Sequence, residues 1–500
     1  MGGPTRTGAE RAENKPKEEI NPRCIVRFRP HDNWDGEYGF DWFRRGDTIE
    51  KYNTEEVRNP DGTKRTKKNY CDYSTLIGKY IPKVKYSGSQ NRFARYAIYD
   101  PVSDEARDAS HTIQNDCLDK FCREYEYRGI KGRNKNYFVP VLSLFYKNSE
   151  VRSEDWGLTT ARVKILVESD SDYILSFIHD TDITIAFSNK RREGNYNVED
   201  VTISCDFTSI NTEKTTRIIE VRAKKNSNER GTLAGLLNIV FGKIKEIDIC
   251  IAKVLISSQR VTDEHGRSIP ACLINETHAA CSAPTATQIE EEKKRIKKAL
   301  AQAQILPNFM PDKKIYMEKN LYRHYFRRTT QENKPVMVIY PPSPSDPSSP
   351  SDLFNVLLHL FNSNIAERER AKYEKVYKVF FINESGGSYN WITRNTEGGL
   401  CGQANDIGSK ETIVFKNDDS ATVPHELLHC LGLKHSFENG NESNRNNRDN
   451  KDIHTFKKEE TSNIMDYSYG GNSLWQCQWT ELRKADGLED YSVMNYTITP

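Results

Sequence analysis

Five residues near the C-terminal end of the chain have the types and the spacing of a metal-dependent reaction centre: His425, Glu426, His429, Gly432 and His435. An α-helix repeats every 3.6 residues, so His425 and His429 project from one helix face, one turn apart. Two imidazoles at this spacing hold one Zn²⁺ ion, and the carboxylate of Glu426 is then placed to take a proton from a water molecule at the metal.

Gly432 sits where this helix must end, because glycine enters the left-handed conformation without a steric penalty from Cβ. The chain can then turn back and bring His435 in as a third nitrogen ligand. Three protein ligands leave a fourth position for water, which is typical of a catalytic zinc rather than a structural one. A buried amphipathic helix explains the leucines of this segment. It does not explain three imidazoles and a carboxylate in register, since histidine makes up only 11 of 500 residues.

A second motif follows downstream, in the segment Ser462–Ser468 with the sequence Ser-Asn-Ile-Met-Asp-Tyr-Ser. Together, His425–His435 and this segment resemble the HExxHxxGxxH motif and the Met-turn of the metzincin clan of zinc metallopeptidases. Met465 matches the methionine beneath the zinc site. Tyr467 matches the tyrosine that approaches the metal in astacin-like and serralysin-like members. The resemblance is confined to the C-terminal part of the chain.

The resemblance implies both a fold and an activity. The implied fold is a twisted mixed sheet with two helices, an active-site cleft beneath an edge strand and a small C-terminal subdomain. Gly398–Gly402 lies where the family carries that edge strand. The implied activity is hydrolysis of peptide bonds in protein or peptide substrates by a zinc endopeptidase. It makes Glu426 the general base and Tyr467 a hydrogen-bond donor to the developing oxyanion.

Three alternatives stay open. A gluzincin-type site would use a downstream carboxylate, Glu459 or Glu460, in place of His435, although Gly432 and Met465 favour His435. A zinc amidase acting on non-protein amides would use the same residues on another substrate. The third alternative is a non-catalytic β-rich delivery or adhesion protein with a vestigial zinc domain, and the intact general base argues against it.

The composition argues against several other classes of protein. Charged residues make up 29% and hydrophobic residues 36% of the chain, and the formal net charge is +2, so nothing marks a nucleic-acid binder. No stretch approaches about 18 uninterrupted apolar residues, so we expect no membrane span. The 11 cysteines form no CxxC pair, which predicts reduced thiols rather than a disulfide framework. Cys117 with Cys122, and Cys272 with Cys281, are pairs near enough in sequence to close a small loop.

The hydrophobic pattern divides the chain into five parts: 1–20, 21–150, 151–257, 258–286 and 287–500. The first is polar, lacks the apolar run of a secretory signal peptide, and is expected to be a disordered leader. Alternating apolar residues predict a β-rich module and then a β-sandwich-like module. An Ala-, Ser-, Thr- and Pro-rich linker and an α+β, metzincin-like zincin domain complete a multidomain fold.

The zincin domain is expected to fold by itself. Its expected elements are a helix starting at the capping box Thr287–Glu290, a strand Val336–Tyr340, a helix Leu353–Glu374, strands Val376–Ile382 and Glu411–Lys416, and a zinc helix capped by Ser420. Every candidate ligand and base lies after residue 330. We therefore expect the fragment Ala283–Pro500 to fold and bind zinc without the first half.

The order of the parts also bears on localisation and partners. β-rich modules ahead of a toxin-like peptidase, without a signal peptide, are similar in arrangement to bacterial effectors exported by contractile injection systems. This similarity implies secretion independent of a signal peptide, with cytoplasmic residence as the alternative. Besides a protein or peptide substrate, it implies a secretion apparatus and an inhibitor or immunity protein as partners.

Overall fold

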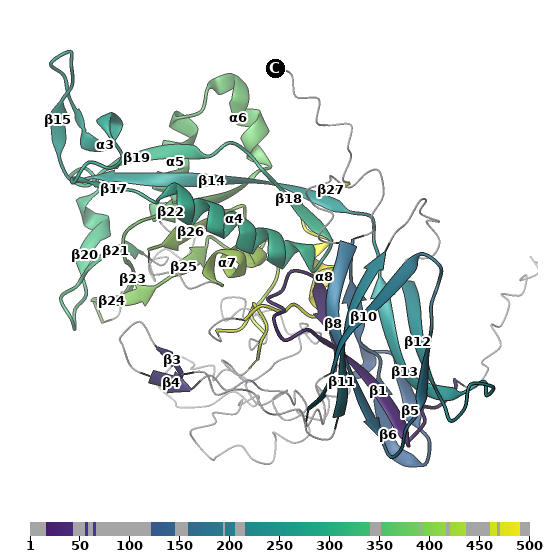
Figure 1. Cartoon of the computed structure of the whole chain (residues 1–500). Helices are drawn as coiled ribbons and strands as arrows, with labels where there is room; N and C mark the ends of the chain where they lie inside the picture. The colour runs from purple at the N-terminus through teal and green to yellow at the C-terminus, as the bar shows by residue number, and fades with distance from the viewer. Residues whose placement is uncertain are drawn as a thin grey trace, which may run out of the picture.

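The computed structural model describes residues 17–43, 56–58, 64–66, 122–145, 159–193, 196–205, 216–340, 352–390, 393–416, 421–436, 461–467 and 471–490. The chain is β-rich, with several separate sheets gathered into an N-terminal β-sandwich and a C-terminal half in which helices cover a large sheet (Figure 1). Among the described residues, no helix is both long enough and apolar enough to cross a bilayer.

The N-terminal half is a single β-sandwich. One sheet has the strand order β1-β8-β11-β10, and the facing sheet has the order β2-β7-β13-β12-β9. The strands are β1 (Cys24–Pro30), β2 (Gly39–Asp41), β7 (Val141–Ser143), β8 (Thr160–Ser169), β9 (Ile174–Ile178), β10 (Ile183–Glu193), β11 (Tyr196–Cys205), β12 (Thr216–Lys224) and β13 (Thr232–Val240). Alternate residues of both sheets point into one shared core, as Val26, Val163 and Leu237 do.

The expected boundary at residue 150 is wrong, because strands from both sides of it pair. β1 pairs with β8 in the register Val26↔Val167, and β7 pairs in parallel with β13 in the register Leu142↔Ile239. Alternating apolar residues predict a half-buried strand but not its distant partner, so the modules 21–150 and 151–257 could not be recognised as one unit. Two hairpins precede β7: β3 (Glu56–Arg58) with β4 (Lys64–Thr66), and β5 (Tyr127–Ile130) with β6 (Arg133–Phe138).

The C-terminal half is organised around β14 (Lys245–Ser257), the longest strand of an eight-stranded sheet. The order is β17-β14-β22-β26-β25, and β18, β19 and β27 also pair with β14. These strands are β17 (Cys281–Ser282), β18 (Ile305–Phe309), β19 (Lys313–Glu318), β22 (Tyr377–Ile382), β25 (Gly402–Ala404), β26 (Glu411–Phe415) and β27 (Glu489–Asp490). β14, β22 and β26 run parallel, and β25 closes their edge in the antiparallel direction.

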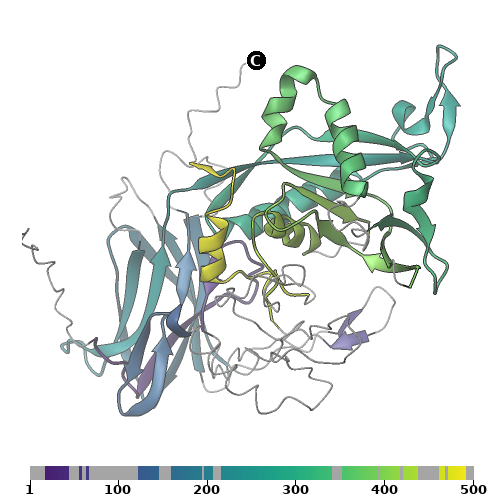
Figure 2. The same ribbon diagram turned by 180° about the vertical axis from the view of Figure 1, so that it is seen from behind.

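Helices cover both faces of the large sheet, because alternate residues of a strand point to opposite sides. They are α4 (Ala286–Ala301), α5 (Asp352–Ser363), α6 (Glu367–Glu374) and α7 (Thr422–Cys430), and α8 (Gln476–Leu482) follows near the end of the chain. Ile249 and Ile251 of β14 pack with α4 and α7. Ala252 and Val254 pack on the other face with α5 and α6, and Figures 1 and 2 show the two layers from opposite sides.

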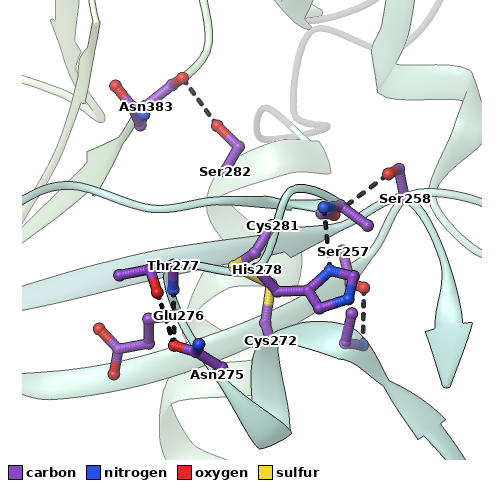
Figure 3. The surroundings of a disulfide bond; sticks show 12 residues. Ser257, Ser258, Cys272, Asn275, Glu276, Thr277, His278, Cys281, Ser282 and Asn383 are labelled. Carbon is purple, nitrogen blue, oxygen red and sulfur yellow. Dashed lines mark hydrogen bonds between the residues drawn. A yellow bond between two sulfur atoms is a disulfide. The ribbon is translucent and has the colours of Figure 1, made fainter.

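The expected boundary at residue 257 is also wrong, since β14 lies before it and belongs to the large sheet. The segment 258–286, expected to be a linker, is folded instead. It contains β15 (Arg260–Thr262), β16 (Ser268–Pro270), α3 (Ala271–Ile274) and β17. A disulfide joins Cys272 to Cys281 there, with a Cα–Cα distance of 5.3 Å (Figure 3). The expectation of reduced thiols is thus corrected for this pair, while Cys117 lies outside the described residues.

A separate four-stranded sheet lies beside the large one. Its order is β20-β21-β23-β24, with bounds β20 (Phe326–Arg328), β21 (Pro335–Ile339), β23 (Gly386–Asn390) and β24 (Asn395–Leu400), and the 3-10 turn η3 (Arg323–Tyr325) precedes it. The strand expected at Val336–Tyr340 is therefore present as β21, but it lies in this small sheet. Parallel pairing of β21 with β23 takes it there.

The other elements expected in the C-terminal half are largely present. β22 and β26 coincide with the strands expected at Val376–Ile382 and Glu411–Lys416. The single helix expected over Leu353–Glu374 is two helices, α5 and α6. The capping box of α4 uses Thr285 and Gln288 rather than the expected Thr287–Glu290, because the helix starts at Ala286, two residues earlier than a cap at Thr287 implies.

Candidate metal centre

Helix α7 has one side that packs into the core and one side that carries the candidate ligands. Val423 and Leu427 join the core between α7 and the large sheet. His425 and His429 lie one turn apart, and both side chains are buried. The apolar contacts on the first side fix the rotation of the helix about its axis, and that rotation aims the two imidazoles.

The start of α7 tolerates an unusual residue. Pro424 lies in the first turn, where its missing N–H is one of the donors that a helix leaves unpaired anyway. The structure places Ala421 at the N-cap, without a hydrogen bond from its side chain. The expected cap, Ser420, lies outside the described residues.

Gly432 ends α7 at the position that the sequence predicts. Its φ of +98° lies in the left-handed region that favours glycine. The Gly432 amide donates to the His429 carbonyl at 2.9 Å, and the Leu433 amide donates to the Leu428 carbonyl at 3.0 Å. These two bonds make a Schellman C-cap. The turn reverses the chain and carries His435 back towards the helix histidines.

The three histidines converge through their Nε2 atoms. Nε2 of His429 lies 3.1 Å from Nε2 of His425 and 3.0 Å from Nε2 of His435. The candidate ligand atoms of all three lie within 4.8 Å of one another. Around a tetrahedral zinc with Zn–N distances of about 2.0–2.1 Å, neighbouring ligand nitrogens are about 3.3 Å apart. Two of the three spacings are near this value, and the three histidines form a group that could hold a metal ion.

Backbone carbonyls fix the tautomers of the two helix histidines. Nδ1 of His425 donates to the Ile464 carbonyl at 2.7 Å, and Nδ1 of His429 donates to the Leu433 carbonyl at 2.7 Å. Burial, and to a smaller extent neighbouring His435, lowers the pKa of His425 to about 4, so the ring is neutral near pH 7. A neutral ring that donates through Nδ1 turns the lone pair of Nε2 outward. Two such lone pairs 3.1 Å apart repel unless a cation lies between them, which a zinc ion would supply.

Glu426 follows His425 in α7, and its carboxylate is held by the edge strand β25. The Ala404 amide donates to its Oε2 at 2.7 Å. Gly402 lets β25 approach this closely, because a Cβ there would lie 2.8 Å from Cγ2 of Thr422 and 2.9 Å from Cγ of Glu426. Burial raises the pKa of the Glu426 carboxyl to about 7, and the bond from Ala404 opposes that rise. A carboxyl with a pKa near neutrality can both accept and release a proton.

The segment carrying Met465 forms a tight turn beneath the histidines. Oδ1 of Asn463 accepts from the Met465 amide at 2.9 Å, and the Asp466 amide donates to the Asn463 carbonyl at 3.0 Å. Met465 is fully buried and packs in the same core as α7. The Met465 carbonyl accepts from the Ser436 amide at 3.0 Å, so the turn supports the chain next to His435 as well as His425.

Tyr467 reaches the cluster from the end of this turn. Its ring centroid lies 4.7 Å from that of His435 and 5.6 Å from that of His425. The side chain is 46% exposed, so it borders the cluster on the solvent side. The structure thus brings Tyr467 and the three histidines together, and Glu426 follows His425 in α7 with its carboxylate bonded to β25.

Other residues of the site were not predicted. Ala404 donates to Glu426 through its backbone, so no side-chain pattern marks it. Gln478 of α8 binds both ends of the Asn463 amide group, at 2.7 and 3.2 Å, and only the fold brings it there. The edge strand expected at Gly398–Gly402 is divided between β24 in the small sheet and β25 in the large one. Glu459 and Glu460 of the gluzincin alternative lie outside the described residues.

Comparisons with known proteins add no assignment to this geometry. No protein-family model matches the chain, and no curated protein matches its sequence. The group of three histidines that can hold a metal ion is therefore the finding on which a functional conclusion rests.

Proposed function

We propose that the chain is a zinc-dependent endopeptidase of the metzincin type. The observation that carries this proposal is the convergence of three Nε2 atoms, of His425, His429 and His435, with the buried Glu426 next to His425 in α7. A structural zinc site would have four protein ligands. The described residues offer three, so a bound zinc would keep one position for water or substrate.

The arrangement of the C-terminal half supports the same family. The resemblance implies a mixed sheet with two helices and a cleft beneath an edge strand. β14, β22 and β26 run parallel, β25 is the antiparallel edge strand, and α4 and α7 lie on one face. On this interpretation the catalytic domain begins at β14 rather than at residue 287.

Each side chain of the site has a separate role in the proposed hydrolysis. When bound, zinc supplies a Lewis acid that polarises the scissile carbonyl and acidifies water. Glu426 would accept a proton from the attacking water and hand it to the leaving amine, since it follows His425 in α7 and its pKa is near neutrality. The Tyr467 hydroxyl donates a hydrogen bond to the oxyanion that develops on the substrate. The Nδ1 bonds keep the rings of His425 and His429 in register throughout.

Export of the protein is a second part of the proposal. The Cys272–Cys281 disulfide supports it, since disulfides persist in oxidising environments and are rare in the cytosol. Secretion without a signal peptide, as an effector or toxin with a secretion apparatus and an immunity protein as partners, remains the biological setting that we propose. Retention of both thiols in reduced form in protein isolated from its natural compartment would speak for cytoplasmic residence.

A digest of unfolded proteins tests the activity. The zinc-loaded chain is incubated with a mixture of denatured proteins, and new peptide termini are identified by mass spectrometry. We expect internal cleavages that stop when a chelator removes the metal and resume when zinc is restored. A chain that binds zinc but cleaves no protein, and instead hydrolyses small amides in a parallel screen, would establish the amidase alternative.

A further inference from the structure

A buried glutamine lies at the junction of the two halves and clamps a backbone segment that leads to the metal centre. Gln302 follows the last residue of α4, and its side chain is fully buried. Its Oε1 accepts from the Leu474 amide at 2.8 Å, and its Nε2 donates to the Asn472 carbonyl at 2.8 Å. One amide group thereby holds two peptide groups of the segment between the Met465 turn and α8.

The clamped segment pairs directly with the turn that supports His425. The Asn472 and Ser473 amides donate to the Ser462 carbonyl at 3.1 and 3.0 Å, and the Ile464 amide donates to the Ser473 carbonyl at 2.9 Å. The Ile464 carbonyl in turn accepts from Nδ1 of His425. A continuous series of hydrogen bonds therefore runs from Gln302 through residues 472–474 and 462–464 to a candidate metal ligand.

The N-terminal sandwich covers the other side of the clamp. Nδ2 of Asn472 donates to the Trp34 carbonyl at 3.2 Å, and Oδ2 of Asp41 accepts from the Gln476 amide at 2.9 Å. Gly36 packs against the clamp so closely that a Cβ on it would lie 2.9 Å from Nε2 of Gln302. The loop after β1 thus shields the amide group from water, which strengthens its bonds.

We infer that Gln302 is a positioning residue for His425, and that the N-terminal sandwich acts on the metal centre through it. This inference deepens the proposed function and rests on it. A histidine ligand needs its second nitrogen held by a fixed acceptor, and here that acceptor belongs to a backbone that Gln302 keeps in place. The first half of the chain then serves the reaction centre as well as any separate role it has.

The test compares two buried glutamines in the full-length chain. Gln302→Met removes the clamp while keeping the size of the side chain. Gln304→Met is the matched control: Nε2 of Gln304 donates to the Leu144 and Val240 carbonyls at 3.0 and 2.8 Å, at the same junction but away from residues 461–474. Three quantities are measured. Zinc affinity is obtained by competition with a chelator, kcat and KM are obtained with a peptide substrate, and the rate of amide hydrogen exchange is followed over residues 461–467.

We expect Gln302→Met to weaken zinc binding by about 10-fold, to lower kcat with KM changed less than about 2-fold, and to speed exchange in 461–467. Gln304→Met should lower thermal stability but leave those three quantities unchanged. Equal effects of the two variants, or an effect of Gln302→Met on stability alone, would overturn the inference. Should Gln302→Met fail to fold, Gln302→Asn, whose shorter amide cannot reach both the Asn472 carbonyl and the Leu474 amide, decides by the same measurements.

Exchange separates failure of this inference from failure of the proposed function. If the wild-type chain binds no zinc, the peptidase proposal fails. Faster exchange over 461–467 in Gln302→Met would then still support the clamp, and unchanged exchange would refute it.

Discussion

Two regions of the molecule differ in the sequence separation of the residues that contact each other. One is the histidine cluster built on helix α7, and the other is the junction between the two halves of the chain. Among the candidate ligands, the paired residues are only four and six positions apart. At the junction, Gln302 contacts a residue 172 positions away, and Gln476 contacts one 435 positions away. Short-range spacing thus decides which side chains meet at the candidate metal site, and long-range contacts hold the backbone that carries them.

The largest effect is expected from a truncation that removes the long-range contacts of β14. The fragment Ala283–Pro500 keeps every ligand but loses β14, which pairs with β22 and packs on both helix layers. We expect it to show no cooperative thermal unfolding and no stoichiometric zinc, which reverses the expectation drawn from the sequence. Circular dichroism and a zinc titration would check this, with a fragment starting at Lys243, which keeps β14, as the control. Cooperative melting of the Ala283 fragment with full-length zinc affinity would contradict the comparison.

Removing one candidate ligand should disrupt the histidine cluster and leave the long-range contacts of the fold intact. His429→Ala deletes the imidazole that lies nearest both others. We expect zinc affinity to fall more than about 100-fold, beyond the effect of losing a supporting bond, while the fold persists. The control is His359→Ala, an exposed histidine of α5, which should keep the metal. Full zinc occupancy of His429→Ala at unchanged affinity would sink the ligand assignment.

Removing the Tyr467 hydroxyl distinguishes a residue that takes part in the reaction from a residue that binds the metal. Tyr467→Phe keeps the ring that packs beside His435 but loses one hydrogen-bond donor. We expect kcat to fall about 10- to 1000-fold with zinc affinity unchanged. Steady-state kinetics and a zinc titration measure both quantities, with Tyr127→Phe in the β5–β6 hairpin, where the side chain is 53% exposed, as the control. An unchanged kcat would remove Tyr467 from the reaction.

A smaller effect is expected where β25 touches α7. Gly402→Ala would push a methyl group against Thr422 and Glu426 and shift the general base. We expect kcat to fall about 10- to 100-fold with zinc retained. Gly129→Ala is the matched control, because its Cβ would meet only the flexible side chain of Glu19, at 3.2 Å. Wild-type kcat in Gly402→Ala would show that close approach of the edge strand does not matter.

The same contrast explains what the sequence could predict. The spacing of His425, His429 and His435, the stop at Gly432 and the adjacent Glu426 are local, so helix geometry alone places them. β22 and β26 are predictable from the short apolar runs Val379–Ile382 and Ile413–Phe415, which are typical of buried parallel strands.

The rest depends on pairing between distant segments. The apolar run of β14 looks the same whether the strand closes the sandwich or lies at the heart of the large sheet. Nothing near Gln302 marks it as the partner of Leu474. The division into modules failed for this reason, whereas the ligand set did not depend on it.

The most direct test of the central claim compares the wild-type chain with Glu426→Gln. Glutamine keeps the size of the side chain and an oxygen that can accept from the Ala404 amide, but it cannot take up a proton at neutral pH. Both proteins are loaded with zinc, and cleavage of a denatured protein is followed by mass spectrometry. We predict equal zinc content and a loss of several orders of magnitude in kcat for Glu426→Gln. Cleavage by Glu426→Gln at the wild-type rate, or no cleavage by zinc-loaded wild type, would contradict a peptidase that uses Glu426 as its base.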